Sequence, residues 1–276
     1  MFVDTHVHFW RLDRNDPIGI NRRIAGIERD FTPEDLRGLT EPLGISRVVV
    51  VQAAPTTTET EHLLDLAVND PFIAAVVGWV DLESEEAPRT LGALAKRAKF
   101  AGIRAMVSET RLPGWLSRPS VRRGLSALRD LDLALDLVVR PTQLPDALRL
   151  VREMPGLRAN INHCGRPLIV AHEWQPWAEL MAAIGTQSEI VCKLSGLIER
   201  GGFEWSLDDL RPYVSHLLAS FGPDRLMFAS NWPVSNLTGT YRRWWEALNQ
   251  VLADLGVGGN ARTAIFHDTA VRFYRL

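Results

Sequence analysis

The sequence predicts a (β/α)8 barrel, the TIM-barrel form of the α/β class, on three observations. Eight short apolar runs recur along the 276 residues, and each is followed by a stretch with helical spacing of apolar residues. Most runs are continuously apolar, as in parallel strands buried on both faces. A doubly wound open sheet uses the same alternation, but no G-x-G-x-x-G phosphate-binding signature follows the first run. We therefore expect a single barrel domain over residues 1–276.

The expected strands, in chain order, are Phe2–Thr5, Val48–Gln52, Ile73–Val80, Phe100–Met106, Ala134–Val139, Arg158–Asn162, Ile190–Leu194 and Leu226–Ala229. The expected helices are Pro33–Leu43, Glu59–Asn69, Glu85–Lys99, Ser120–Leu131, Gln143–Met154, Pro176–Ile184, Leu207–Phe221 and Tyr241–Leu255. The first helix has a marked start, because Thr32 can cap it and Pro33 suits its first turn. In such a barrel, the chemistry lies at the carboxyl ends of the strands.

Composition excludes several classes of protein. The chain is 46% hydrophobic and 23% charged, which is ordinary for a globular protein. Its net charge is -2 and it has no basic block, so we expect neither a nucleic-acid nor a membrane partner. Two cysteines exclude a disulfide scaffold. The start, MFVDTHVHFW, is not a secretory signal, and we expect a cytoplasmic protein that binds a small molecule. The oligomeric state stays open, a homodimer included.

Two histidines follow the first expected strand, in Asp4-Thr5-His6-Val7-His8. Side chains two residues apart on an extended chain point the same way, so His6 and His8 form a candidate metal-ligand pair. His163 follows the sixth strand and would reach the same barrel mouth. Each histidine taken singly is more typical of a hydrogen-bonded core residue, and the coincidence of the three favours a metal site.

Polar and aromatic residues lie near or just after the carboxyl ends of the other expected strands. They are Gln52, Trp79, Arg104, Arg140, Lys193, Asn231 and Trp232. Barrel interiors are filled mainly by Val, Ile and Leu, so this set indicates a ligand site for an oxygen-rich molecule, either anionic or hydroxylated. Arg104, Arg140 and Lys193 bring positive charge, and arginine can bind carboxylates in a bidentate way. Gln52 and Trp79 are candidate substrate contacts beside them. Trp232 is a further aromatic surface on which a ligand could stack.

Taken together, the strand-end motifs resemble the amidohydrolase superfamily. The motifs are Asp4-Thr5-His6-Val7-His8, Asn162-His163-Cys164-Gly165-Arg166-Pro167, Cys192-Lys193-Leu194-Ser195-Gly196-Leu197 and Ser230-Asn231-Trp232-Pro233-Val234. More narrowly, they are similar to the amidohydrolase-related branch of sugar lactonases, the L-fuconolactone and L-rhamnonolactone hydrolase type. The resemblance covers nearly the whole chain, and the motifs are specific only in combination.

The resemblance implies a hydrolase that opens an aldonolactone by attack of water on the ring ester carbonyl. It implies one divalent ion, zinc by preference, held by His6, His8 and His163, and it includes members with a cationic, metal-free pocket. A bound ion would make water nucleophilic. Arg104 and Lys193 would stabilise the oxyanion or bind the sugar hydroxyls, with His163 and Asn231 completing the catalytic group.

Three residues depart from the family pattern. The family usually carries Asp where this chain has Asn231, and an amide cannot accept the proton of an attacking water. Asn231→Asp is therefore expected to raise hydrolysis about tenfold or more. Ala105 replaces a frequent His, and Arg140 replaces the His of two-metal members. Two other functions stay open: a decarboxylase or other carbonyl-group hydrolase, and a non-catalytic barrel that binds sugar acids.

Overall fold

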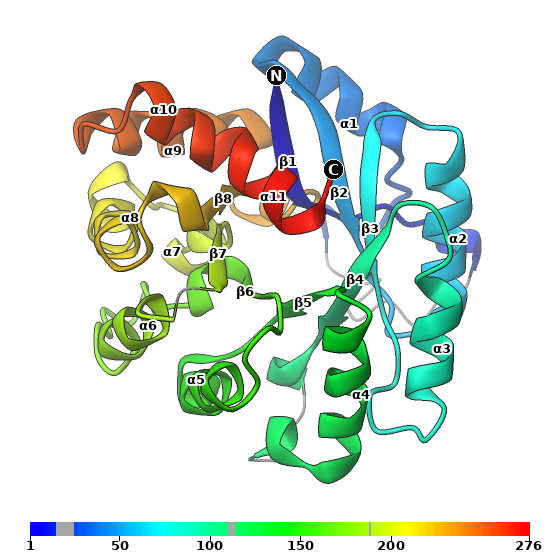
Figure 1. The fold of residues 1–276 in the computed structure, drawn as a ribbon. Coiled ribbons are helices and arrows are strands. Elements are labelled where there is room, and N and C mark those ends of the chain that lie inside the picture. Colours follow the sequence, from blue (N-terminus) through cyan, green and yellow to red (C-terminus); the bar gives the residue numbers. More distant parts are fainter. Residues whose placement is uncertain (15–24, 110–113, 188) are drawn as a thin grey trace.

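The structure is a computed structural model that describes residues 1–14, 25–109, 114–187 and 189–276. Its centre is a parallel sheet of eight strands, arranged in space in chain order (Figure 1). The strands are β1 (Phe2–Val7), β2 (Ile45–Val51), β3 (Ile73–Gly78), β4 (Phe100–Ala105), β5 (Ala134–Leu137), β6 (Ala159–Ile161), β7 (Ile190–Leu194) and β8 (Leu226–Phe228). Each expected run corresponds to one of these strands, and the predicted (β/α)8 barrel is confirmed.

The ring is completed between β8 and β1 by the segment that follows β8. Asn231 donates its backbone N–H to the His6 carbonyl at 2.9 Å, and His8 donates to the Trp232 carbonyl at 2.8 Å. Val7 and Trp232 form a parallel bridge. These bonds hold the chain after β8 directly beside the two histidines of β1, so barrel closure itself brings Asn231 to the site.

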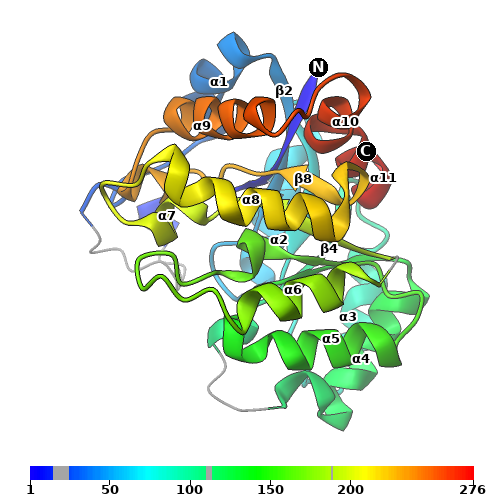
Figure 2. The same ribbon diagram turned by 90° about the vertical axis from the view of Figure 1, so that its left-hand side faces the viewer.

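Helices cover the outside of the barrel in both ribbon views (Figures 1 and 2). They are α1 (Pro33–Thr40), α2 (Thr57–Val68), α3 (Ala87–Leu94), α4 (Pro119–Asp130), α5 (Leu144–Glu153), α6 (Trp177–Gly185), α7 (Leu197–Gly201), α8 (Leu207–Phe221), α9 (Tyr241–Asp254), α10 (Gly259–Thr263) and α11 (Thr269–Tyr274). The eight expected helices correspond to α1–α6, α8 and α9, whereas α7, α10 and α11 were not expected. Thr32 caps α1, as its sequence predicted, and the structure adds a capping box with Asp35.

The inside of the barrel has an apolar end and a polar end. At the apolar end, small and branched side chains from the strands pack against the last helix, α11. This cluster includes Val3, Val49, Val77, Ala101 and Met227 from the strands, and Phe273 and Tyr274 from α11. Figure 1 shows α11 lying across this end, near both chain termini. The apolar plug leaves the opposite end, at the carboxyl ends of the strands, for polar side chains.

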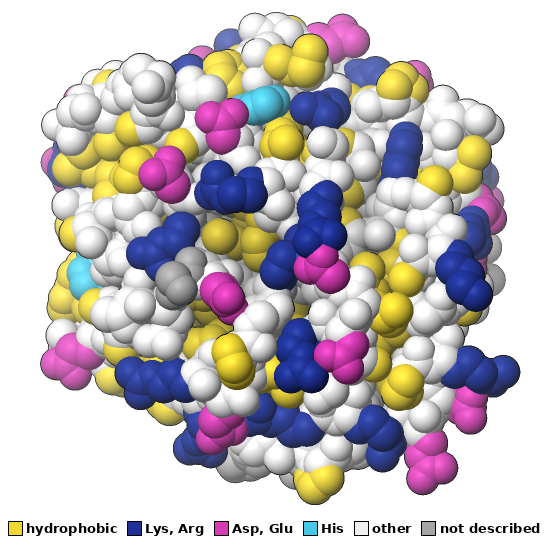
Figure 3. All heavy atoms as spheres, viewed as in Figure 1, with side chains coloured by type: hydrophobic (Ala, Val, Ile, Leu, Met, Phe, Trp, Pro, Cys, Tyr) yellow, Lys and Arg dark blue, Asp and Glu magenta, His cyan; other side chains and the backbone are white. Residues whose placement is uncertain are grey.

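The surface carries mixed charge. Figure 3 shows Lys and Arg side chains interspersed with Asp and Glu on the face viewed in Figure 1, without a single basic block. Within the part of the chain that the structure describes, no helix has both the length and the apolar character needed to cross a bilayer.

Candidate active site

His6 and His8 lie at the end of β1 and point toward each other. His6 is within the strand and His8 follows directly after Val7, and both are buried. Their Nε2 atoms are 3.2 Å apart. The spacing of two residues has therefore brought both rings to the same side, as the extended backbone predicts.

Hydrogen bonds assign the protons of this pair. His8 Nδ1 is 2.7 Å from the carbonyl oxygen of Val51, which can only accept, so His8 carries its proton on Nδ1. Lys193 Nζ lies 3.3 Å from His6 Nδ1, and an ammonium can only donate. His6 therefore carries its proton on Nε2 and donates it to His8 Nε2. Each ring nitrogen of the pair has a partner in this arrangement.

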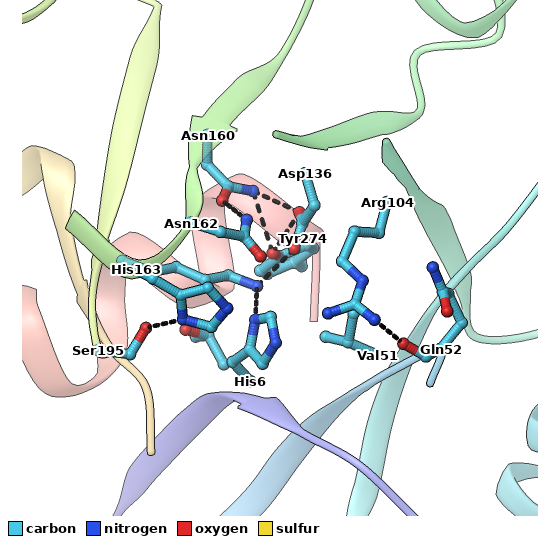
Figure 4. A network of polar contacts seen from close by, with 12 residues as sticks. His6, Val51, Gln52, Arg104, Asp136, Asn160, Asn162, His163, Ser195 and Tyr274 are labelled. Atoms are coloured by element: carbon cyan, nitrogen blue, oxygen red, sulfur yellow. Dashed lines mark hydrogen bonds and ion pairs between the residues drawn. The ribbon is translucent and has the colours of Figure 1, made fainter. Parts of the chain in front are cut away.

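Lys193 is itself held by a buried carboxylate. Its Nζ is 2.5 Å from Asp136 Oδ2, and neither side chain is exposed to solvent. Tyr274 donates to Asp136 Oδ1 at 2.8 Å, and Asn160 Nδ2 donates to the same oxygen. Burial lowers the pKa of Lys193, although the Asp136 charge acts in the opposite direction. Figure 4 shows His6, Asp136, Asn160 and Tyr274 close together at the centre of the barrel. Lys193 contacts both His6 and Asp136, and we call the five residues the barrel-centre network (His6, Asp136, Asn160, Lys193 and Tyr274).

His163 approaches from the other side. It lies in a short 3-10 turn, Asn162–Gly165, and its own φ is +52°. Its Nδ1 is 2.9 Å from Ser195 Oγ, and its ring centroid is 4.5 Å from that of His6. The backbone of Gly196 passes so close that a Cβ there would stand 2.6 Å from His163 Cβ. The glycine after β7 thus makes room for the ring.

The three histidines are neutral around pH 7. Burial lowers the pKa of His8 to about 3, helped by the charge of Arg104. Burial likewise lowers the pKa of His6, with Lys193 as the second cause, and that of His163. A neutral imidazole in this surrounding donates or accepts a hydrogen bond, but takes up a proton poorly.

A cavity of about 180 Å³ opens at this end of the barrel. Its lining consists of His8, Ala53, Arg104, Met106, Val138, His163, Arg166, Gly196, Glu199, Arg200, Asn231 and Val234. Four residues expected at the site are in this lining: His8, Arg104, His163 and Asn231. The cavity carries three arginines and one acid, so its lining has a net positive charge.

Two of the other expected residues lie elsewhere in the interior. Lys193 is fully buried below the histidines and reaches the site through His6. Trp232 is 1% exposed and packs edge-on against Phe31, with ring centroids 5.1 Å apart. The bonds that close the barrel draw Trp232 into the apolar core, which differs from its expected place on a ligand face.

Gln52, Trp79 and Arg140 are also absent from the described cavity lining. Gln52 is buried, and its backbone carbonyl accepts a hydrogen bond from Arg104 Nη2, which orients that guanidinium. The backbone of Trp79 is tied to the Thr60 hydroxyl. Arg140 is exposed. Substrate contacts of these three stay predictions.

Sequence reasoning missed two acids. Asp136 is the one charged residue within the apolar run Ala134–Val139, and that run by itself predicts only a strand. Glu199 lies in α7, five residues beyond β7, where no pattern singles it out. Its Oε1 accepts a 2.6 Å hydrogen bond from Asn231 Nδ2, and burial raises its pKa.

The donor set does not fit a divalent ion in this arrangement. The His6 Nε2 that would bind the ion carries a proton, because Lys193 occupies Nδ1. Asn231 supplies no negative charge, and Lys193 and Arg104 bring positive charge nearby. In the described ranges, no three His, Cys, Asp or Glu side chains are grouped so that they could hold a metal. The three histidines converge: His6 and His8 share a hydrogen bond, and the His163 ring packs against the His6 ring with centroids 4.5 Å apart.

Comparison with known proteins places the chain in a family. A family model described as amidohydrolase matches residues 3–276. The L-fucono-1,5-lactonase of Burkholderia ambifaria is 37% identical over 276 residues, which is 99% of this chain and 95% of that protein. The L-fucono-1,5-lactonase of Burkholderia multivorans is 30% identical over 285 residues, covering 99% and 96%.

A solved structure agrees with these sequence relatives. An amidohydrolase from Burkholderia multivorans, crystallised with bound Zn, superposes with a TM-score of 0.92 at 28% identity. The superposition covers 100% of this chain and 99% of that one. Family match, relatives and fold thus agree over almost the whole length, and the chain belongs to the amidohydrolase family.

Proposed function

We propose that this protein is a lactonase, which hydrolyses the ring ester of a sugar-acid lactone at the mouth of the barrel. The observation that carries the proposal is one small cavity in which Arg104, His163 and a buried carboxylate face the same space. Such a set can hold a carbonyl, stabilise the oxyanion and orient a water. The two L-fucono-1,5-lactonases among the relatives support a six-carbon deoxy-lactone as substrate.

Each residue has a role in this proposal. Arg104 donates hydrogen bonds to the carbonyl oxygen, which becomes negative when water adds to the ring ester. His163 has its Nδ1 engaged by Ser195, so its other nitrogen is directed to the ligand or to the attacking water. Lys193 acts through His6, whose ring it orients, and does not contact the substrate.

No step of this proposal passes through a metal. The resemblance implies zinc at His6, His8 and His163, and one structural relative carries Zn. In this chain the ion would require His6 to move its proton to Nδ1, opposite the Lys193 ammonium. We therefore propose that the protein's own groups suffice. The metal content of the purified protein should be measured together with its turnover of lactones.

The test is turnover of a panel of aldonolactones, including L-fucono-, L-rhamnono- and galactono-lactones, followed by acid release. We expect hydrolysis of at least one of them, at a rate that chelator dialysis leaves within about twofold. Release of carbon dioxide from a carboxylated aromatic would identify a decarboxylase instead. Binding of a lactone without turnover would identify a non-catalytic sugar-acid barrel, and either result would refute the proposal.

A further inference from the structure

The site described so far has no group that readily accepts a proton. Asn231 occupies the place of the family's usual Asp, and an amide has no basic site of use at neutral pH. His8 has both ring nitrogens occupied, by Val51 and by His6. His163 has its Nδ1 engaged by Ser195 Oγ at 2.9 Å. Yet ester hydrolysis by water needs a proton acceptor for efficient attack.

Glu199 is the carboxylate that lies in this cavity. It belongs to α7, which follows β7, and it lines the same space as His163 and Asn231. One oxygen, Oε1, accepts the hydrogen bond from Asn231 Nδ2 at 2.6 Å. The other oxygen, Oε2, is buried and has no hydrogen-bond partner. A buried carboxylate oxygen without a partner is costly, and such groups are retained where a ligand or water completes them.

We propose that Glu199 is the general base of the lactone hydrolysis, with Asn231 as the residue that positions it. This inference rests on the proposed function. Asn231 and Glu199 then form an amide–carboxylate pair in which the carboxylate has moved from the segment after β8 to α7. Asn231 Nδ2 holds Oε1 in place, which leaves the unpartnered Oε2 as the oxygen that accepts the proton of a water in the substrate-bound site.

A new bond forms between the water oxygen and the lactone carbonyl carbon, while one O–H bond of the water breaks and its proton passes to Glu199 Oε2. The electron pair of the carbonyl π bond moves to the carbonyl oxygen beside Arg104. When the tetrahedral intermediate collapses, the ring C–O bond breaks and Glu199 returns the proton to the departing ring oxygen. The product is the open-chain hydroxy acid.

The charges around Glu199 support this role. Burial raises the pKa of Glu199, whereas the hydrogen bond from Asn231 and the charges of Arg200 and Arg166 act to lower it. The titratable and charged groups lining the same cavity are His8 after β1, Arg104 on β4, His163 and Arg166 after β6, and Arg200 on α7. In the plot of kcat/KM against pH, we therefore expect the midpoint of the acidic limb to lie above 4.5, the ordinary pKa of a glutamate. Activity is lost as the pH falls through that midpoint, because Glu199 becomes protonated.

The experiment compares Glu199→Gln with Glu204→Gln, an exposed glutamate nearby that serves as the matched control. Glu199→Gln keeps an oxygen for Asn231 and removes the base. We expect kcat to fall about 10²–10⁴-fold, with KM changed by less than about threefold and the acidic limb abolished. Glu204→Gln should behave like the parent. A Glu199→Gln enzyme within about threefold of the parent, with an unchanged pH profile, overturns the inference.

Asn231→Asp gives an independent test. Next to Glu199, a second carboxylate raises the pKa of one member, so we now expect a lower rate at pH 7 and an acidic limb moved to higher pH. In the Glu199→Gln background, the same change exchanges the two roles, and we expect at least a tenfold recovery. If Asn231→Asp instead accelerates the parent tenfold, the base belongs at position 231 and the inference fails.

The exchanged double variant also covers the case in which Glu199→Gln does not fold, because it retains one amide and one carboxylate. The acidic limb of the double variant's pH profile is then compared with that of the parent. A limb shifted from the parent's, as expected when the aspartate introduced at position 231 replaces Glu199 as the base, supports the inference, and a pH profile identical to the parent's overturns it. If the parent protein hydrolyses no lactone, both the lactonase proposal and the role of Glu199 are refuted. If the parent hydrolyses a lactone and the Glu199→Gln variant is equally active, only the role of Glu199 is refuted.

Discussion

Asp136→Asn tests the barrel-centre network through stability. The substitution keeps the size of the side chain and removes its charge. Its Oδ1 can still accept from Tyr274, but an amide NH2 placed at Oδ2 would face the Lys193 ammonium, which is also a donor. Lys193 is then a buried cation that keeps its contact with His6 Nδ1 at 3.3 Å but has lost its carboxylate.

The size of this loss in stability follows from the complete burial of the Asp136–Lys193 pair. Both side chains have 0% exposure, and Nζ lies 2.5 Å from Oδ2, so solvent does not screen the loss. Removing one partner of such a pair costs about 3–5 kcal/mol. With an unfolding entropy of about 2.1 cal/mol/K per residue, a chain of 276 residues should lose roughly 5–9 °C of Tm. Lys193→Met should cost less, because Asp136 keeps its hydrogen bonds from Tyr274 and Asn160.

The deficit of Asp136→Asn should depend on pH. Burial already holds the pKa of Lys193 below the ordinary 10.5, and the variant loses the charge that raises it. The folded variant then binds the lysine proton less strongly than the unfolded chain. Its stability therefore rises with pH toward 10.5, and the full deficit is present at pH values below the lowered pKa.

Denaturant unfolding followed by tryptophan fluorescence measures these differences, at pH 7 and at pH 9.5. The double variant Asp136→Asn/Lys193→Met is the control, since it removes both charges and should recover most of the loss. A single Asp136→Asn variant within 1 kcal/mol of the parent, or a double variant as unstable as the single, would refute the account of the buried pair.

Three further outcomes are expected. Gly196→Ala should lower kcat at least tenfold and lower the free energy of unfolding by about 1–2 kcal/mol, because φ is +72° and the new Cβ meets His163. Unchanged steady-state kinetics would contradict this expectation. Arg104→Ala should lower kcat/KM about 10²–10³-fold across the lactone panel, and an unaffected panel would exclude its role on the oxyanion. Trp177→Phe removes the 2.7 Å hydrogen bond to the Cys164 carbonyl and should lower the free energy of unfolding by about 1–3 kcal/mol, measured by denaturant titration, while kcat is preserved. A lower kcat with unchanged stability would contradict this expectation.

Local sequence patterns were sufficient for the architecture and for one part of the site. The apolar runs located all eight strands, because a strand buried on both faces needs continuous apolar residues whatever its partners are. Thr32 and Pro33 form the predicted start of α1. His6 and His8 converge because side chains two residues apart share a side of an extended chain, which depends on nothing beyond that strand.

The partners of the polar residues were decided by the tertiary structure. Lys193 was expected at the substrate, but it binds Asp136, which is 57 residues away in sequence. Trp232 was expected at the mouth, but barrel closure packs it against Phe31. Such contacts depend on which strands are neighbours and on how far each strand extends into the barrel, and neither is encoded in a local pattern.

The same reason explains Glu199. The sequence identifies Asn231 as a residue that departs from the family pattern. No sequence pattern identifies the residue that binds it. Glu199 reaches it only because α7 and the segment after β8 meet above the same cavity, 32 residues apart in the chain. The sequence by itself determined the barrel and the histidine pair through interactions between near neighbours. The tertiary structure determined which carboxylate faces the cavity, because that choice depends on the relative position of separate strands and helices.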